Sequence, residues 1–183
     1  MNSAFPGFDS PAVGFEQPFE MLLACHERVR RSVALLVRLV RHVDERGHDA
    51  QSRSAASDVL RYFDLAAPLH HDDEEQHVFP ILSDSGDADL ADAVSGLYRD
   101  HLRMSALWAA LRSTLEAWSL PGTAEAGSDA FVDQVAEFDR MYAAHLATEE
   151  GTVFPAARAR MDRKLLAVMS ADMQQRRSAP VRQ

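Results

Sequence analysis

Residues 70–80 read HHDDEEQHVFP, and residues 145–155 read HLATEEGTVFP. We call these stretches the first and second copy. They share a histidine, two glutamates that begin four positions after it, and a final Val-Phe-Pro. Four residues are slightly more than one helical turn, so in a helix the histidine and the first glutamate of each copy share one face. Each copy therefore predicts an imidazole and a carboxylate side by side.

The repeat extends upstream of both copies. Phe63-Asp64 and Phe138-Asp139 are separated by the same 75 positions as the two copies, and so are His26 and His101. The chain therefore has two similar halves. Each half predicts a helical hairpin that carries one histidine on its first helix and a His/Glu pair on its second.

The composition excludes several classes of protein. A length of 183 residues with 46% apolar residues predicts one globular domain with a substantial core. No stretch has the length of a membrane span or the pattern of a secretion signal, so we expect a cytoplasmic protein without membrane contact. One cysteine, Cys25, excludes an internal disulfide and suits a reducing compartment. A net charge of -9 argues against nucleic acid as a partner.

Apolar residues recur every three or four positions over long segments, which predicts amphipathic helices. We expect long helices over residues 18–46, 52–82 and 88–118, and a fourth that begins at Ser128 or Asp129. A short helix over residues 162–175 offers Leu165, Leu166, Val168 and Met169 for packing against the end of the bundle. Pro68 and Pro80 predict local irregularities in the second helix, and Gly151 and Pro155 in the fourth.

These elements predict an all-α fold, an antiparallel up-down-up-down four-helix bundle, because helices with one apolar stripe must bury it against one another. The bundle would span residues 18–160. Residues 1–17, rich in Phe, Pro and Gly, would form an N-terminal arm lying on it, and residues 161–183 a short C-terminal helix and tail.

Polar residues interrupt the apolar stripes at six repeated positions: His26, His70, Glu74, His101, His145 and Glu149. An unpaired carboxylate in an apolar core costs several kcal/mol, and no Lys or Arg lies on these stripes to neutralise it. A metal ion supplies the missing positive charge, and histidine with carboxylate suits iron, manganese or zinc. We predict a dinuclear site with two histidines per ion and with Glu74 and Glu149 as bridges.

Other polar residues near the two copies have weaker signals. His77 lies on the stripe and is a candidate extra or second-sphere ligand, and Tyr142 either donates to a metal-bound oxygen or fills the core. By helical phase we expect His71, Glu75 and Glu150 to face solvent. Asp64 and Asp139 either hydrogen-bond a ligand imidazole or form surface ion pairs.

The doubled motif, preceded in each half by a further histidine, resembles the hemerythrin-like, or HHE cation-binding, family over about residues 20–160. The resemblance implies a four-helix bundle around a non-haem di-iron site, with the same six residues as iron ligands. The chain departs from oxygen-carrying hemerythrins, which have a histidine where this chain has Ser105, and an aspartate at a spacing of five as the last carboxylate. It is closer to the four-histidine, two-glutamate members, which include iron or oxygen sensors, nitric-oxide-related proteins and proteins linked to iron-sulfur repair.

Three functions follow as hypotheses. The first is a binding protein with two iron ions that takes up dioxygen, nitric oxide or peroxide for sensing or scavenging, with a protein partner or a homodimer where it senses. Its pocket would be lined by Phe63, Phe138, Met104, Trp108 and Val29. The second is a di-iron enzyme that turns over peroxide or nitric oxide, or an iron donor for iron-sulfur repair. The third is a structural bundle that holds zinc, manganese or mixed metals.

Overall fold

The computed structural model describes residues 14–122 and 125–178 of the chain. The predicted arm therefore lies almost entirely outside the described residues. Of its last four residues, Phe15 contacts the C-terminal helix, where its carbonyl accepts a hydrogen bond from the Ser170 hydroxyl and its ring lies under the Arg177 guanidinium.

Most of the described residues are helical and none is in a strand, as the sequence predicts. The helical segments in chain order are α1 (Pro18–Arg46), α2 (Ala50–Arg61), the π-helical η1 (Tyr62–Ala66), α3 (Ala67–His77), α4 (Phe79–Ser83), α5 (Ala88–Ser119), α6 (Asp129–Thr148), the π-helical η2 (Glu149–Val153), α7 (Phe154–Arg158) and α8 (Arg163–Ser178). No helix in the described part of the chain is long and apolar enough to cross a membrane.

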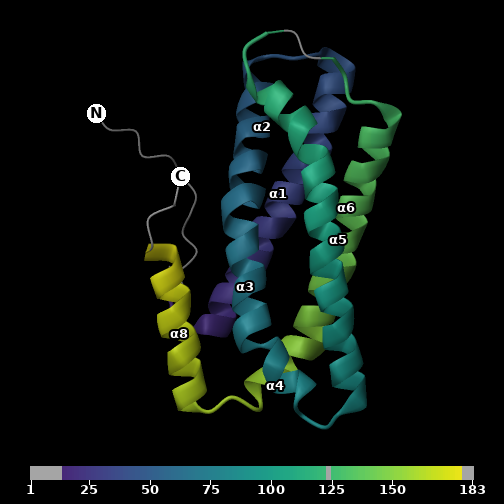
Figure 1. The fold of residues 1–183 in the computed structure, drawn as a ribbon. Coiled ribbons are helices and arrows are strands. Elements are labelled where there is room, and N and C mark those ends of the chain that lie inside the picture. Colours follow the sequence, from purple (N-terminus) through teal and green to yellow (C-terminus); the bar gives the residue numbers. More distant parts are fainter. Residues whose placement is uncertain (1–13, 123–124, 179–183) are drawn as a thin grey trace, which may run out of the picture.

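The long helices pack as a four-sided bundle (Figure 1). The α1 helix contacts α2 and α6, and α5 contacts the same two helices from the opposite corner. The segments that join successive long helices lie at alternate ends of the bundle in Figure 1. This arrangement turns the apolar stripes of all four helices toward one interior.

Local sequence sets the helix ends. The α1 helix starts at Pro18 and stops at Gly47, which adopts a φ of 76° that a residue with a Cβ disfavours. Asp49 and Ser52 form a reciprocal cap at the start of α2, with each side chain accepting from the other backbone N–H. Ser128 accepts from the backbone N–H of Phe131 and caps α6.

The predicted irregularities at the prolines are present. A π-helical turn, η1, ends two residues before Pro68, which has no backbone N–H to donate. The second predicted helix breaks again at Val78, two residues before Pro80, where α3 gives way to α4. In the second half the irregularity is η2, which contains Gly151 and ends just before Pro155. The helices are thus locally unwound close to the polar residues of both copies.

The core consists of two apolar clusters separated by a polar layer. On α1, Leu22 belongs to one cluster and Val29 to the other, and the buried His26 lies between them. The α5 helix repeats this order around His101. The layer is therefore shielded from water along the bundle axis on both sides.

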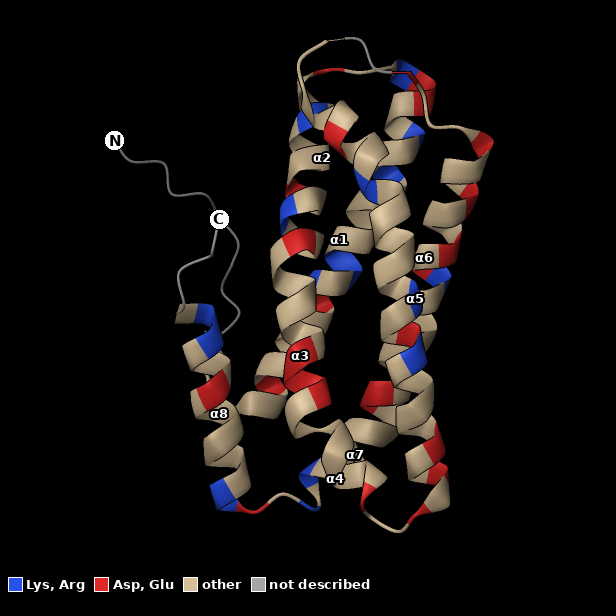
Figure 2. Ribbon diagram, viewed as in Figure 1, with Lys and Arg blue, Asp and Glu red and all other residues tan. Residues whose placement is uncertain are grey.

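The α8 helix lies along the outside of the bundle, where it contacts α3 and α1 (Figure 1). Met169 and Met173 are its buried apolar residues. The expectation for Leu165 and Val168 is wrong, because both are exposed: α8 packs lengthwise against α3 and α1, which turns these two side chains outward. Figure 2 shows basic segments at both ends of this helix.

Candidate metal centre

The six repeated residues converge in the polar layer from every side of the bundle. His26 comes from α1, His70 and Glu74 from α3, His101 from α5, His145 from α6 and Glu149 from η2. Each is at most 4% exposed. They form two overlapping groups whose ligand atoms lie within 4.8 Å of one another; the first is His26, His70, Glu74 and Glu149, and the second is Glu74, His101, His145 and Glu149.

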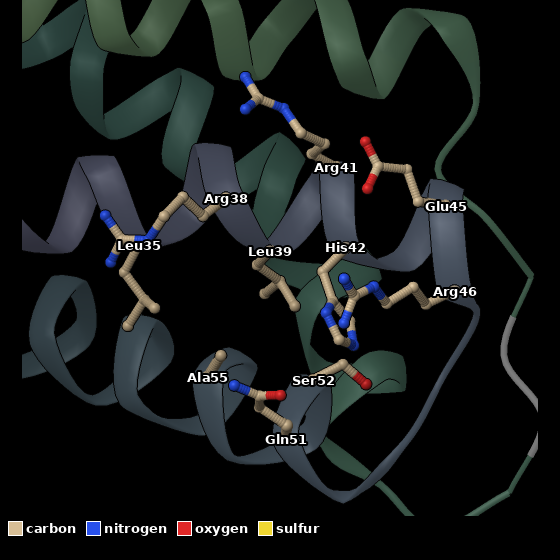
Figure 3. Close-up of a pocket in the computed structure, with 10 residues that line it drawn as sticks. All are labelled: Leu35, Arg38, Leu39, Arg41, His42, Glu45, Arg46, Gln51, Ser52 and Ala55. Carbon is tan, nitrogen blue, oxygen red and sulfur yellow. The ribbon is translucent and has the colours of Figure 1, made fainter.

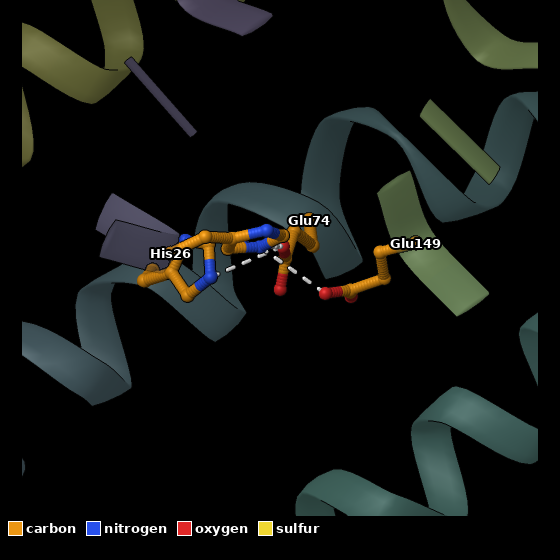
Figure 4. Close-up of side chains that lie close together, drawn as sticks. His26, Glu74 and Glu149 are labelled. Atoms are coloured by element: carbon orange, nitrogen blue, oxygen red, sulfur yellow. Dashed lines mark ion pairs between the residues drawn. The ribbon is translucent and has the colours of Figure 1, made fainter. Parts of the chain in front are cut away.

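The two glutamates belong to both groups because each directs its two oxygens to different histidines. Glu74 places Oε1 3.3 Å from Nε2 of His70 and Oε2 3.6 Å from Nε2 of His101. Glu149 places Oε2 3.2 Å from Nε2 of His26 and Oε1 3.1 Å from Nε2 of His145. Figure 4 shows His26, Glu74 and Glu149 pointing toward one another.

These separations fit two metal ions. Two donor atoms that each lie about 2.1 Å from one ion at a right angle are about 3 Å apart. The buried oxygens of Glu74 and Glu149 and the Nε2 atoms of His26 and His70 have no hydrogen-bond partner among the described residues. Buried polar atoms without partners are costly, so a set that points to one centre favours a ligand there. The residues present therefore fit a pair of cations.

Burial sets the charge of the layer in the metal-free protein. Burial and the neighbouring Glu149 raise the pKa of Glu74 well above its ordinary value. Burial also opposes ionisation of Glu149, but contacts with His145 and His26 hold its pKa below the ordinary value. The pair thus carries one negative charge and one proton. Burial and the neighbouring His145 lower the pKa of His101 to about 3, so this imidazole is neutral and able to bind a metal.

Glu75 and Glu150 do not simply face solvent, contrary to expectation. The Nδ1–H of His101 donates to Oε1 of Glu75 at 2.7 Å, and the Nδ1–H of His26 donates to Oε1 of Glu150 at 2.8 Å. These bonds leave the Nε2 lone pair of each imidazole facing the layer. The phase argument failed because a long side chain beside the stripe reaches across the groove to the next helix. The signal that could have found both residues is their presence in both copies.

The aspartate before the first copy contacts no ligand imidazole. Asp64 accepts from Trp108 Nε1 at 2.9 Å and pairs with Arg112 at 3.0 Å, so the ion-pair alternative is confirmed for it. The carboxylate beside His145 is Asp100, whose Oδ2 lies 3.5 Å from Nδ1 of that imidazole. Asp100 has no counterpart in the repeat pattern, since the residue before His26 is Cys25, and the sequence offered no signal for it.

His71 is partly buried between α3 and α5 and does not face solvent fully, contrary to expectation. Its ring stacks on that of His101 at 3.8 Å between centroids and 11° between planes. The ring of Tyr142 lies 6.4 Å away on a nearly parallel plane. Helical phase places the residue after His70 at the edge of the stripe, and here the neighbouring α5 helix covers that edge. Burial and the nearby His101 and His145 lower the pKa of His71 well below its ordinary value.

The remaining candidates lie outside the two groups. His77 Nε2 is 2.7 Å from Oδ2 of Asp172 in α8, which places it in the contact between α3 and α8. Tyr142 is buried in the apolar core against Phe63 and Phe138, and burial raises its pKa. Of the predicted pocket walls, Phe63, Phe138 and Trp108 form one aromatic cluster.

A surface pocket of about 350 Å³ lies between α1 and α2, away from the layer (Figure 3). Arg38, Arg41 and Arg46 are among its lining residues, and Leu39 and Ala55 form part of its apolar surface. None of the six repeated residues lines it. The pocket is therefore separate from the candidate metal centre.

Comparison with known proteins agrees with the geometry. Residues 17–175 match the model of the hemerythrin HHE cation binding domain. An uncharacterised protein of Haemophilus influenzae is 31% identical over 163 residues, which cover 89% of this chain and 91% of that protein. The family match covers most of the chain, and the buried His/Glu groups are those of a metal-binding protein. The chain therefore belongs to the hemerythrin HHE cation-binding family.

Proposed function

We propose that this chain is a non-haem di-iron protein that binds dioxygen, nitric oxide or peroxide for sensing or scavenging. The observation that carries the proposal is the shared use of Glu74 and Glu149, each of which directs one oxygen to each histidine pair. One ion needs no such sharing, whereas two adjacent ions require it. Nitrogen and oxygen donors without sulfur suit iron, and also manganese or zinc.

The chain itself would position the two ions, balance their charge and keep water away from them. His26 and His70 would hold one ion, His101 and His145 the other, and the two glutamates both. Two adjacent irons would supply paired changes of oxidation state and an open position for a small ligand. Glu75 and Glu150 would fix the orientation of two imidazoles, and the apolar clusters on either side would limit the entry of water.

Metal content and the visible spectrum test this proposal together. Protein purified without added metal should contain close to two irons per chain, with a near-ultraviolet oxo-bridge band that bleaches on reduction. Glu74→Ala and Glu149→Ala should lose the iron and the band. Glu137→Ala is the matched control, because the side chain of this glutamate is 40% exposed, pairs with Arg103 and lies outside both ligand groups. Two irons retained in both ligand variants would contradict the proposal.

The same preparation separates the alternative functions. Binding for sensing or scavenging predicts a stable adduct with nitric oxide or oxygen in stoichiometric amount. An enzyme predicts multiple turnovers of peroxide or nitric oxide, and an iron donor predicts rapid loss of iron to a mild chelator. A structural site predicts a colourless zinc protein that loses cooperative unfolding on chelation.

The proposal includes a cytoplasmic location and, for a sensing role, a protein partner or a second copy of the chain. Cell fractionation and measurement of the mass in solution, with and without the adduct, test these two points.

A further inference from the structure

The two histidine pairs have equivalent ligands but different surroundings. Within the repeat, His71 of the first copy corresponds to Leu146 of the second, 75 positions later. Leu146 is buried at 2% exposure within the apolar core. The polar ring of His71 instead stacks on His101 at 3.8 Å between centroids, while the rings of His70 and His145 are 6.0 and 6.2 Å away. A small polar molecule would therefore meet a hydrogen-bonding group at this position of the first copy, where the second copy has an aliphatic side chain.

The position of His71 argues against a role as a fifth histidine ligand. Its ring lies 3.8 Å from the His101 ring and nearly parallel to it. Imidazole binds metals through a lone pair that lies in the plane of its ring. An ion in the plane of the His101 ring would lie about one stacking distance outside the plane of the His71 ring, so His71 could not bind the same ion. His71 is accordingly absent from both groups of converging ligand atoms.

The Nε2 atom of His71 is buried without a hydrogen-bond partner among the described residues. A buried polar atom left unpaired destabilises the fold. The neighbouring rings of His101 and Tyr142 offer their faces, which do not satisfy an in-plane N–H. A molecule that enters beside His101 and His145 would supply the missing partner.

We propose that the small-molecule ligand binds on the His101/His145 side of the layer, where the Nε2–H of His71 donates a hydrogen bond to it. The chemical class is a small anion or a polar diatomic with an acceptor atom. The inference rests on the proposed function, because the ligand would be held by the ion on that side. It assigns the binding position to one of the two histidine pairs.

Azide binding to the iron-loaded oxidised protein tests the inference. His71→Leu introduces the residue of the second copy, and His71→Gln keeps an amide donor. His77→Leu is the matched control, because it makes the same substitution in the same helix at a histidine whose partner is Asp172. Iron per chain is measured first, and azide affinity then follows from absorption titration. Unfolding curves of the metal-free proteins establish that each variant folds.

His71→Leu should keep two irons per chain and bind azide about tenfold more weakly, as expected for one lost hydrogen bond to a charged group. His71→Gln should recover part of the affinity, and His77→Leu should match the parent chain. Unchanged azide affinity in His71→Leu would overturn the inference and leave the proposed function intact, with water as the partner of His71. Loss of one iron in His71→Leu would overturn it too, by making His71 a metal ligand. Absence of iron from the parent chain would overturn both.

Discussion

The two copies of the motif are alike where they face the polar layer and different where they face outward. His70 and Glu74 correspond to His145 and Glu149, and all four are buried. Asp73, by contrast, corresponds to Thr148, which is only half-buried. Asp73 has no exposed surface and lies 2.6 Å from both Arg176 and Arg177 of α8. The α8 helix covers Asp73 in the first copy, whereas the equivalent Thr148 of the second copy keeps part of its surface in solvent.

The second glutamate of each copy links the two halves of the chain. Glu75 of the first half holds His101 of the second, and Glu150 of the second half holds His26 of the first. Neither half therefore orients its own first histidine. The crossed arrangement makes the geometry of each histidine pair depend on correct packing of both hairpins.

Removal of a carboxylate that is shared by both ligand groups should cause the largest loss of bound metal. Glu74→Ala and Glu149→Ala should each reduce bound metal from two ions toward none, because each glutamate serves both histidine pairs. His70→Ala and His145→Ala should each weaken mainly one ion. Elemental analysis after dialysis measures the difference. Equal metal loss from all four variants would show that the two ion positions are not separable.

Loss of the ion pairs between Asp73 and the two α8 arginines should destabilise the protein, whereas a substitution at the equivalent position of the second copy should not. Arg176→Gln with Arg177→Gln leaves the Asp73 carboxylate buried without a partner, which should destabilise the protein by roughly 3–5 kcal/mol. Thr148→Ala, at the equivalent half-buried position, removes no ion pair and should change stability by less than about 0.5 kcal/mol. Urea unfolding measures both. A double variant as stable as the parent would mean that α8 does not hold the first copy in solution.

The two bridging glutamates should respond to pH with opposite sign in the metal-free protein. The raised pKa of Glu74 means that the folded chain keeps a proton that the unfolded chain loses above the ordinary value of 4.5. This contribution to stability is therefore lost as pH rises through the folded pKa, by up to about 1.4 kcal/mol per pH unit. The pKa of Glu149 is lowered, so its contribution is present above 4.5 and is lost as pH falls.

Unfolding in the presence of a chelator at several pH values between about 2 and 8 measures these slopes. Glu74→Gln should flatten the loss of stability toward neutral pH, and Glu149→Gln should flatten the loss toward acid. The same slope in the parent and in Glu74→Gln would mean that this carboxyl carries no extra proton in the folded chain.

Substitution of Glu75 or Glu150, which each hold a histidine of the other half, should have a smaller effect on metal binding. Glu75→Gln and Glu150→Gln keep the size of the side chain but weaken the hold on one imidazole each. Metal affinity should fall about 10- to 100-fold, with Glu75→Gln acting on the ion at His101 and Glu150→Gln on the ion at His26. Competition with a chromophoric chelator measures the affinities, and Glu137→Gln is the control. Parent affinity in both variants would assign the two glutamates a purely structural role.

The repeat in the sequence was sufficient to predict the all-α class, the helix segments and the six residues of the polar layer. It was sufficient because buried helices have a fixed period, so a histidine or glutamate on an apolar stripe must enter the core, and only a strong partner makes this favourable. The prolines likewise predicted the local irregularities, since a missing N–H is a property of the residue alone.

Only the tertiary structure decided the neighbours of these residues. The distance between α3 and α5 decides two of these contacts. It determines whether Glu75 faces water or reaches His101, and whether His71 lies on the surface or stacks on His101. The burial of Asp73 depends on α8, which lies about 100 positions away in the chain. Helical period fixes which face a residue is on, but contacts at the edge of that face depend on the distance and rotation of the next helix, which no local pattern encodes.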